Sequence, residues 1–347
     1  MQEKIKLTQF SKGSGCGCKI PSAQLDIILK GNEARTDFKN LLVGNNSRDD
    51  AAVFDLGDGT ALISTTDFFT PIVDDAFDFG RIASVNAISD IYAIGGKPVL
   101  AIAILGWNIE KLSPELAQQV IKGSRSVCEE AGIPLAGGHS IDTTDPIFGL
   151  AVNGIIPIKN LKRNNTAQNG DLLFLTKPLG IGIISTALKR GIVKDEDYKA
   201  ALEIMLSLNN AGEELGKLKG VSAMTDVTGF GLLGHLIEMA DGSNLSANIN
   251  YAAVPLIEGI EFYCKQLCFS NNVYRNWNSY EKKVKGIEGN SFITLCDPQT
   301  SGGLLIAVNP DSLNEFNKVM KEFGLETITN KPIGKFIARE DYSIKVE

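Results

Sequence analysis

The sequence predicts an α/β (α+β) protein with two domains of similar size. Short apolar runs of strand length alternate with segments of helical periodicity in both halves of the chain, and a polar segment at 159–170 separates the halves. A length of 347 residues is also typical of two domains rather than one. We therefore expect a flexible glycine- and cysteine-rich loop region at 1–20, an N-terminal domain at 21–158 and a C-terminal domain at 170–347.

In the first half, the turn signal Gly57-Asp58-Gly59 joins two apolar runs, 51–56 and 61–65, which we expect to pair as a hairpin. Ser113 followed by Pro114 is a typical helix start, because serine caps the first turn and proline fits its first position. Two helices and three further strands complete the expected N-terminal domain: helices at 79–94 and 114–131, and strands at 99–105, 133–136 and 147–156.

In the second half, the pattern starts again after the polar segment. The expected strands are 172–176, a short one near Ala223, 245–249, 292–295 and 304–308, and the expected helices are 182–190, 196–217, 232–240 and 312–323. The polar segment 271–290 predicts a long irregular surface loop.

Charge and composition argue against several classes of protein. The net charge is −7 and the sequence pI is near 5.1, with no run rich in lysine and arginine, which argues against a nucleic-acid-binding surface. The longest apolar stretch, 99–105, is far shorter than the roughly 20 residues of a membrane span. The N-terminus has no apolar signal segment and the six cysteines follow no disulfide pattern, so we expect a protein of the reducing cytoplasm.

The run from Gly13 to Lys19 combines two thiols, three glycines and a lysine, with no bulky side chain. Glycines let the backbone bend and approach a ligand, and a lysine beside a thiol favours the reactive thiolate. We interpret the run as a mobile loop that carries a reactive sulfur. A metal-ligand pair at Cys16 and Cys18 and an incidental role stay open, although Cys-x-Cys is tighter than ordinary zinc-ligand spacing.

Aspartates adjoin several apolar runs. Asp49 and Asp50 precede the first expected strand, Asp67 follows the second, and Asp226 follows the apolar run near Ala223. Strand ends in α/β folds face the ligand crevice, and carboxylates gathered there suit divalent cations. Each aspartate taken singly is equally explained as a turn former or a helix cap.

Asp90 has a different setting, because it lies on the inward stripe of the expected helix 79–94, one turn after Asn86. A buried carboxylate is costly unless it is paired or binds a metal ion. We interpret Asp90 as a metal or nucleotide ligand, with a structural salt bridge or cap as the alternative.

Two glycine-rich segments and two histidines complete the candidate set. Residues 229–234 match G-x-G-x-x-G, which is weak by itself and fits a helix N-terminus that meets phosphate or packs closely. Residues 137–140 predict a turn that offers backbone N–H groups to a phosphate or ribose. A P-loop is excluded because its motif is absent. We expect His235 to pack structurally, while His139 stays open between site and structure.

These residues together favour phosphoryl transfer without a P-loop. Aspartates alone would repel phosphate, so Mg²⁺ would have to bridge them to a nucleotide, and the thiol suggests a soft acceptor.

Several motifs carry a resemblance that covers nearly the whole chain. They are Gly15-Cys16-Gly17-Cys18-Lys19-Ile20, Leu42-Val43-Gly44-Asn45 with Arg48-Asp49-Asp50-Ala51-Ala52-Val53, Thr65-Thr66-Asp67-Phe68-Phe69, Asn86-Ala87-Ile88-Ser89-Asp90-Ile91-Tyr92-Ala93, Leu135-Ala136-Gly137-Gly138-His139-Ser140-Ile141-Asp142, Thr225-Asp226-Val227-Thr228-Gly229-Phe230-Gly231 and Asp297-Pro298-Gln299-Thr300-Ser301-Gly302-Gly303. With these motifs the chain resembles the selenophosphate synthetase (selenide, water dikinase) family, of the aminoimidazole ribonucleotide synthetase-like ATP-binding superfamily. Related families of that superfamily lack the Gly-Cys-Gly-Cys-Lys loop.

The resemblance implies a two-domain fold whose N-terminal domain pairs with its copy in a homodimer. It implies an enzyme that converts ATP, selenide and water into selenophosphate, AMP and orthophosphate, and so supplies activated selenium for selenocysteine and selenouridine synthesis. It also brings a monovalent cation such as K⁺ and a selenium-delivery protein into consideration.

The resemblance further assigns roles by motif position. Cys16 and Lys19 match the catalytic residues, and the magnesium ligands match Asp50, Asp90 and Asp226. The segments that contact ATP match Lys19, Ser47, Arg48, Asp49, Asp67, Asp90, Gly138, His139 and Ser140.

Two alternatives remain on the sequence alone. One is a non-catalytic carrier of chalcogen or metal that uses the Cys16 and Cys18 pair, which predicts no stabilisation by ATP or Mg²⁺. The other is a different kinase-like member of the superfamily, which selenide-dependent formation of AMP would distinguish.

Overall fold

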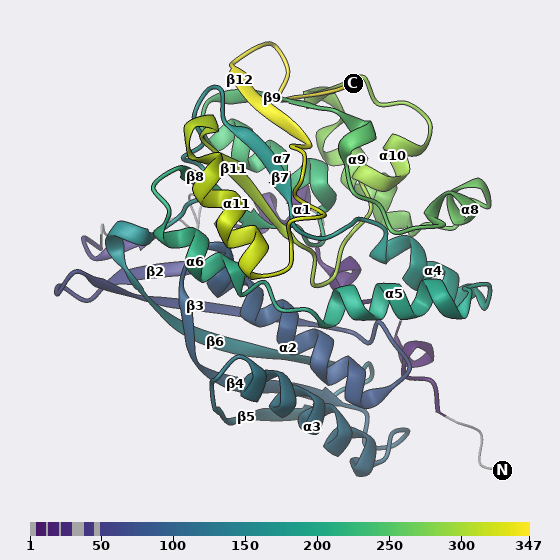
Figure 1. The fold of residues 1–347 in the computed structure, drawn as a ribbon. Coiled ribbons are helices and arrows are strands. Elements are labelled where there is room, and N and C mark those ends of the chain that lie inside the picture. The colour runs from purple at the N-terminus through teal and green to yellow at the C-terminus, as the bar shows by residue number, and fades with distance from the viewer. Residues whose placement is uncertain (1–4, 12, 21, 30–37, 45–48) are drawn as a thin grey trace.

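The computed structural model describes residues 5–11, 13–20, 22–29, 38–44 and 49–347, so the predicted ATP-contacting residues Ser47 and Arg48 lie outside the described residues. The chain forms two α/β domains that stack along their length, the N-terminal one in the lower half of Figure 1 and the C-terminal one in the upper half. Among the described residues, no helix is long and apolar enough to cross a membrane.

The N-terminal domain is built on a six-stranded sheet with the order β1-β2-β3-β6-β4-β5. All neighbouring strands are antiparallel except β4 and β5, which run parallel. The strands are β1 (Leu41–Val43), β2 (Ala52–Asp55), β3 (Thr60–Phe69), β4 (Lys97–Trp107), β5 (Leu135–Asp142) and β6 (Ile147–Pro157).

Helices α2 (Ala76–Ala93) and α3 (Pro114–Glu130) pack against one face of this sheet (Figure 1). Asp75 caps α2 by accepting hydrogen bonds from the backbone N–H groups of Phe77 and Asp78. The two helices can approach closely because residue 80 is a glycine. A Cβ at this position would lie 1.9 Å from a backbone oxygen of α3.

Helix α2 is buried almost all round because it lies between the N-terminal sheet and the C-terminal domain. It contacts β3 and β6 on one side and α5, α6 and β8 on the other. The helix contains three polar residues, Asn86, Ser89 and Asp90. The bounds of these partners are α5 (Asp195–Leu206), α6 (Ala211–Lys217) and β8 (Val221–Asp226). This central position brings the three polar residues to the domain junction.

The C-terminal domain has a seven-stranded sheet with the order β10-β13-β9-β12-β7-β11-β8. Its other strands are β7 (Leu172–Leu175), β9 (Leu245–Ile249), β10 (Val284–Lys285), β11 (Leu304–Val308), β12 (Gly334–Ala338) and β13 (Ile344–Val346). The remaining α-helices are α1 (Ser22–Leu29), α4 (Ile181–Arg190), α7 (Gly231–Gly242), α8 (Ile260–Lys265), α9 (Asn271–Tyr280), α10 (Asn290–Leu295) and α11 (Leu313–Glu322).

Three expectations about elements of the C-terminal domain are wrong. The segment 271–290, expected as an irregular loop, begins with α9, whose mostly polar sequence still buries Val273, Asn276 and Tyr280 on one face. The expected strand 292–295 is part of helix α10, since a short apolar run does not by itself separate helix from strand. The expected helix 196–217 is two helices, α5 and α6, with a break that contains Ser207 and Asn209.

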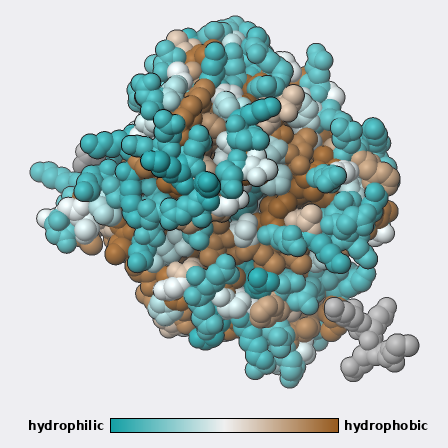
Figure 2. Space-filling model, viewed as in Figure 1, coloured by the Kyte–Doolittle hydropathy of each residue, from teal (hydrophilic) through white to brown (hydrophobic). Residues whose placement is uncertain are grey.

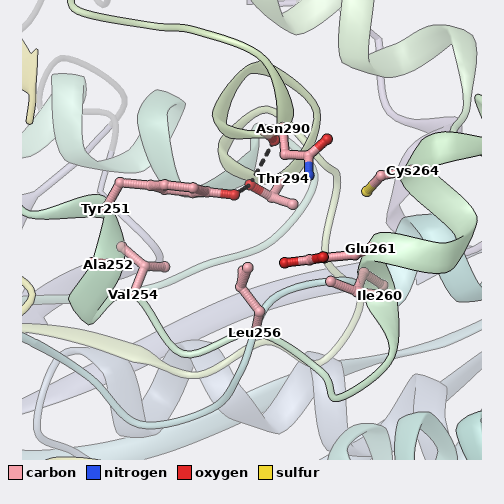
Figure 3. A pocket seen from close by; sticks show the side chains of 9 residues that line it. All are labelled: Tyr251, Ala252, Val254, Leu256, Ile260, Glu261, Cys264, Asn290 and Thr294. Carbon is pink, nitrogen blue, oxygen red and sulfur yellow. Dashed lines mark hydrogen bonds between the residues drawn. The ribbon is translucent and has the colours of Figure 1, made fainter.

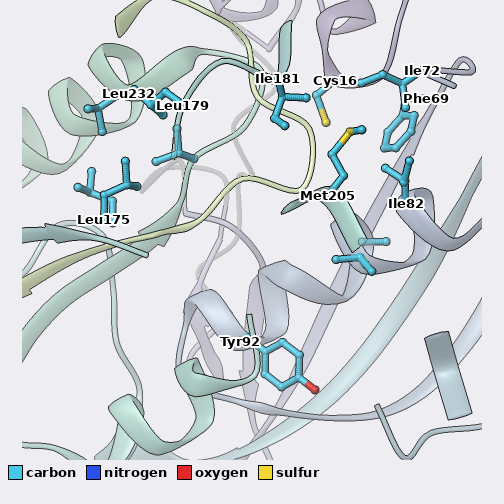
Figure 4. Close-up of a cluster of buried hydrophobic side chains, with 14 of the residues drawn as sticks. Cys16, Phe69, Ile72, Ile82, Tyr92, Leu175, Leu179, Ile181, Met205 and Leu232 are labelled. Atoms are coloured by element: carbon cyan, nitrogen blue, oxygen red, sulfur yellow. The ribbon is translucent and has the colours of Figure 1, made fainter. Parts of the chain in front are cut away.

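One buried apolar cluster joins the two domains. Figure 4 shows Cys16, Phe69, Ile72 and Ile82 of the N-terminal part beside Ile181 and Met205 of the C-terminal domain, and all belong to the same cluster. The cysteine of the glycine-rich loop, Cys16, is therefore packed into the core at the junction of the domains.

At the surface the apolar groups are interspersed with hydrophilic side chains over both domains (Figure 2).

Candidate active site at the domain junction

Three carboxylates meet where the two domains touch. Asp50 stands just before β2, Asp90 lies on α2 and Asp226 ends β8, and one ligand oxygen from each lies within 4.8 Å of the others. Asp226 is buried, whereas Asp50 and Asp90 are partly buried. Two carboxylates come from the N-terminal domain and one from the C-terminal domain, so the contact between domains assembles the cluster.

Burial and neighbouring carboxylates disfavour ionisation of Asp50 and Asp90 in the cluster. Burial, and then the charge of Asp226, raise the pKa values of Asp50 and Asp90 well above the ordinary aspartate value. Burial raises the pKa of Asp226 to about 6, although the hydrogen bond from Ser89 lowers it. Oδ2 of Asp50 is buried and has no hydrogen-bond partner in the structure. Converging carboxylate oxygens with a free buried acceptor fit a hard divalent cation such as Mg²⁺.

Three hydroxyl groups orient these carboxylates. Thr65 donates to Oδ2 of Asp90 at 2.5 Å, and Ser89 donates to Oδ2 of Asp226 at 2.5 Å. In addition, the Thr225 hydroxyl donates to Oδ1 of Asp50 at 2.8 Å. These hydroxyls were missed by sequence reasoning. A recurring pattern could have indicated two of them, because Ser89 and Thr225 each directly precede a predicted metal ligand.

The predicted reactive thiol, Cys16, is buried at the same junction. It begins the 3₁₀-helix η2 (Cys16–Cys18) and has no exposed surface, whereas Cys18 is exposed. Cys16 Sγ lies 3.2 Å from Oδ1 of Asn86, and the Cys16 backbone N–H donates to Thr300 Oγ1 at 3.0 Å. Because one sulfur is buried and the other faces solvent, the pair does not present a chelating site.

Lys19 favours a Cys16 thiolate, as expected, but in this arrangement of the loop burial and Asp67 outweigh it. Burial raises the pKa of the Cys16 thiol well above its ordinary value, and the charge of Asp67 raises it further, while Lys19 lowers it by less. The Lys19 charge is balanced by Asp67, whose Oδ2 lies 3.3 Å from Nζ. The buried sulfur is therefore held as a neutral thiol.

Contacts from the C-terminal domain hold the loop in place. Lys189 Nζ donates to the Gly13 carbonyl at 2.6 Å, and the Asn272 side chain donates to the Gly17 carbonyl. Gly15 adopts a φ of 50°, and a Cβ there would lie 2.4 Å from Oγ1 of Thr300. Glycine is therefore required at this position for the loop to approach Thr300.

Lys19 and Asp67 form an ion pair beside the cluster. Burial lowers the pKa of Lys19, but nearby carboxylates, Asp67 first, outweigh it and raise that pKa above the ordinary value. Asn86 donates to Asp67 Oδ2 at 2.6 Å. Asp67 lies inside β3 and not at a strand end as predicted, because β3 continues to Phe69.

Asp49 and Asp50 adjoin each other at the entrance to β2. Burial raises the pKa of Asp49 to about 6, and its Oδ2 is buried without a hydrogen-bond partner. Its other oxygen accepts a hydrogen bond from the Asp50 backbone N–H at 3.2 Å. The free oxygen gives Asp49 an acceptor beside the cluster.

The structure does not bring the segment 138–140 to the cluster within one chain. The expected glycine-rich turn is part of the edge strand β5, which is exposed over nearly its whole length. The sheet register runs from Asp67 through Leu150 and Ala103 to Gly138, three strand spacings of about 4.8 Å each. His139 and Ser140 are exposed in the same strand.

His235 packs structurally, as predicted. It is buried, and its Nε2 accepts a hydrogen bond from the Thr228 backbone N–H at 3.1 Å. Burial lowers its pKa to about 3, so the ring is neutral. The G-x-G-x-x-G segment that precedes it starts α7, and a Cβ on Gly231 would lie 2.9 Å from backbone atoms of Leu295 and Cys296. The segment serves close packing.

A separate cavity lies in the C-terminal domain and shares no residue with the cluster or the loop. Its volume is about 280 Å³, and the Tyr251 and Thr294 hydroxyls lie 3.0 Å apart on its wall (Figure 3). Glu261 and Cys264 of α8 face it from the opposite side (Figure 3).

Sequence similarity to known proteins extends over the whole chain. The family of AIR synthase related proteins matches with its N-terminal domain over residues 48–156 and with its C-terminal domain over residues 168–347. The chain is 54% identical over 346 residues to the selenide, water dikinase of Pseudomonas putida, with 100% of both chains covered. It is 55% identical over 325 residues to that of Escherichia coli strain K12, with 94% of both covered.

Solved structures share the fold at low sequence identity. Thiamine monophosphate kinase from Aquifex aeolicus has a TM-score of 0.66 and 16% identity, with 94% of this chain and 96% of that chain covered. The hydrogenase maturation protein HypE in complex with ATP has a TM-score of 0.66 and 18% identity, with 99% and 94% covered. These matches confirm the predicted two-domain fold class and, with the relatives above, the prediction of a phosphotransferase. The chain belongs to the selenide, water dikinase family of AIR synthase related proteins.

Proposed function

We propose that the protein makes selenophosphate from selenide, ATP and water, with release of AMP and orthophosphate. One observation supports this most directly: a soft thiol and a lysine lie beside a cluster of three carboxylates at the domain junction. Carboxylates suit a cation that carries a nucleotide, and a thiol suits a chalcogen. Activated selenium of this kind is the form needed to synthesise selenocysteine and selenouridine.

The carboxylates Asp50, Asp90 and Asp226 would hold Mg²⁺, and ATP would be contacted by Lys19, Asp49, Asp67 and Asp90. When bound, Mg²⁺ neutralises phosphate charge and orients the phosphoryl groups. Lys19 offers a point charge to the γ-phosphoryl oxygens, at the cost of its pairing with Asp67. A monovalent cation such as K⁺ would add to this neutralisation.

The reaction divides into two displacements. Selenide attacks the γ-phosphorus, so that a P–Se bond forms, the bond to the β-phosphate oxygen breaks and ADP is left. Water then cleaves ADP to AMP and orthophosphate. The loop that carries Cys16 excludes bulk water from the site while it is held by Lys189, Asn272 and Thr300. Cys16 would bind the selenium, since its sulfur is the buried thiol of this loop.

A homodimer would place the segment 138–140 in a partner's site. The sheet face opposite α2 and α3 carries exposed apolar side chains, among them Phe54, Leu62, Phe68, Ile102, Ile141 and Ile155. Exposed apolar area of this extent is typical of an interface. Since Gly138 lies far from Asp67 within one chain, ATP contacts from Gly138, His139 and Ser140 would come from the second copy.

Two further proposals concern the setting of the enzyme. All six cysteines are free in the structure, which supports residence in the reducing cytoplasm. Because Cys16 is buried, we propose that a selenium-delivery protein supplies selenide when the loop opens.

Phosphorus NMR of the products, in anaerobic solution with ATP, Mg²⁺ and selenide, tests the reaction. We expect one selenophosphate and one orthophosphate for each AMP, and no AMP without selenide. Formation of ADP as the final product, or of AMP at the same rate without selenide, would instead indicate another phosphotransferase. The absence of any stabilisation by Mg·ATP would support a non-catalytic carrier.

A further inference from the structure

Asp226 is held by a residue of the other domain. The Ser89 hydroxyl on α2 donates to Oδ2 of Asp226 on β8 at 2.5 Å, and the two residues are 0% and 1% exposed. Since Asp226 is the one cluster carboxylate from the C-terminal domain, this bond fixes it relative to the two from the N-terminal domain. Buried from water, the carboxylate depends on such a donor for its orientation.

Asn209, in the break between α5 and α6, determines where the Ser89 proton points. Its Nδ2 donates to Ser89 Oγ at 2.8 Å and to the Gly302 carbonyl at 2.8 Å, so both amide hydrogens are used. A hydroxyl has a single proton. Because the Asn209 amide donates to the Ser89 oxygen, the Ser89 hydroxyl proton must point away from Asn209. It is donated to the Asp226 carboxylate instead.

The same backbone turn reaches the thiol. Ser301, next to Gly302, donates its N–H to Oδ1 of Asn86 at 2.8 Å, and this is the oxygen that lies beside Cys16 Sγ. An asparagine that merely closed the helix break would bond nearby backbone, but both acceptors of Asn209 lie about a hundred residues away in sequence. Its contacts therefore serve the domain junction.

We propose that Ser89 and Asn209 are positioning residues that hold Asp226 in the orientation required to bind the divalent cation. The relay runs from the Asn209 amide to the Ser89 hydroxyl and from that hydroxyl to the carboxylate. This inference rests on the proposed function, because it assumes that Asp50, Asp90 and Asp226 bind a metal ion.

Mn²⁺ binding to the full-length protein without nucleotide tests the relay, with free Mn²⁺ measured by electron paramagnetic resonance. Partners behind a metal ligand commonly change metal affinity by about 10- to 100-fold. We expect a loss in this range for Ser89→Ala and for Asn209→Ala. Asn209→Asp, which has the same shape but lacks the donor, should lose a similar factor. Circular dichroism and the unfolding midpoint establish that each variant is folded.

The chain offers matched controls. Ser84 is also a fully buried serine of α2, and it bonds to Gly80 and Ser124 away from the cluster. Asn276 is a buried asparagine whose Nδ2, like that of Asn209, donates two hydrogen bonds, both of them to backbone carbonyls. Ser84→Ala and Asn276→Ala should keep the wild-type Mn²⁺ affinity.

The double variant separates a relay from two independent structural losses. If Asn209 acts through Ser89, Ser89→Ala combined with Asn209→Ala binds Mn²⁺ about as weakly as Ser89→Ala alone. Additive losses, or wild-type affinity in Asn209→Asp, would overturn the relay while Asp226→Asn still lost the metal. Wild-type protein that binds no Mn²⁺, or Asp226→Asn that binds it normally, would overturn the metal site itself and the relay with it.

Discussion

Oδ1 of Asn86 lies 3.2 Å from Cys16 Sγ and 2.8 Å from the backbone nitrogen of Ser301. The same side chain donates through Nδ2 to Asp67, the ion-pair partner of Lys19. One asparagine of α2 therefore contacts the Cys16 thiol, the carboxylate that pairs with Lys19 and a turn of the C-terminal domain. The arrangement of the thiol depends on contacts from three distant parts of the chain.

The two thiols of the loop should differ sharply in importance. Cys16→Ser should abolish selenophosphate formation and leave Mg·ATP binding intact, because an oxygen at this buried position is a poor partner for selenium. Cys18→Ser is the matched control, since Cys18 is exposed, and should keep most of the activity. The measurement is selenide-dependent AMP formation beside calorimetric titration with Mg·ATP. Equal loss in both variants would refute the assignment of the chemistry to Cys16.

Asp90→Asn should separate ligand binding from stability. Removing one of three converging carboxylates relieves repulsion, so the unfolding temperature without ligand should stay the same or rise. The stabilisation by Mg·ATP should nearly vanish, because the cation loses a ligand. Thermal unfolding with and without Mg·ATP measures both effects. Asp58→Asn changes an exposed turn carboxylate and should respond to Mg·ATP like the wild type. Full stabilisation of Asp90→Asn by Mg·ATP would contradict the metal site.

Asp297 should make the fold less stable as the pH rises. Burial raises its pKa to about 8, even though N–H groups of Gln299, Ile183 and Gly182 lower it. Between the unfolded value of 3.8 and the folded value, the native state binds more protons than the unfolded state, so its stability falls with increasing pH. Asp297→Asn removes this loss and places its amide nitrogen where Oδ1 has no partner.

Urea unfolding of Asp297→Asn and wild type from about pH 5 to about pH 8 checks the sign. The free energy of unfolding of the variant should increase relative to the wild type along this range. Asp311→Asn, an exposed aspartate of the same domain, should show no such trend. A difference between Asp297→Asn and wild type that stays constant with pH would contradict a raised pKa.

The exposed sheet face should hold two copies together. Ile102→Asp places a charge on a side chain that is 42% exposed in the single chain, and it should convert a dimer to a monomer. Ile192→Asp, at 38% exposed in the C-terminal domain, is the matched control and should leave the dimer intact. Sedimentation velocity measures the change. If the segment 138–140 contacts ATP in the second copy, the monomer should also bind Mg·ATP more weakly; a monomeric wild type would refute the interface.

The sequence alone determined the fold class, the family and the residue types of the site. Alternating apolar runs and helical stripes are local patterns, and they predicted most strands and helices. The local pattern failed where tertiary contacts decide the outcome. Helix α9 is mostly polar and gains its stability from one buried face, and α10 is too short for periodicity to distinguish it from a strand.

Only the tertiary structure decided how the site residues relate to one another. Strand pairing extends β3 past Asp67, and the Asp67 side chain forms an ion pair with Lys19. The strand order of the sheet separates Gly138 from Asp67 by three strand spacings. Burial at the domain junction raises the pKa of the Cys16 thiol and outweighs the effect of the neighbouring Lys19. The physical reason is that charge, burial and hydrogen bonding depend on neighbours in space, and the neighbours of Cys16 and Asp226 come from segments far away in the chain.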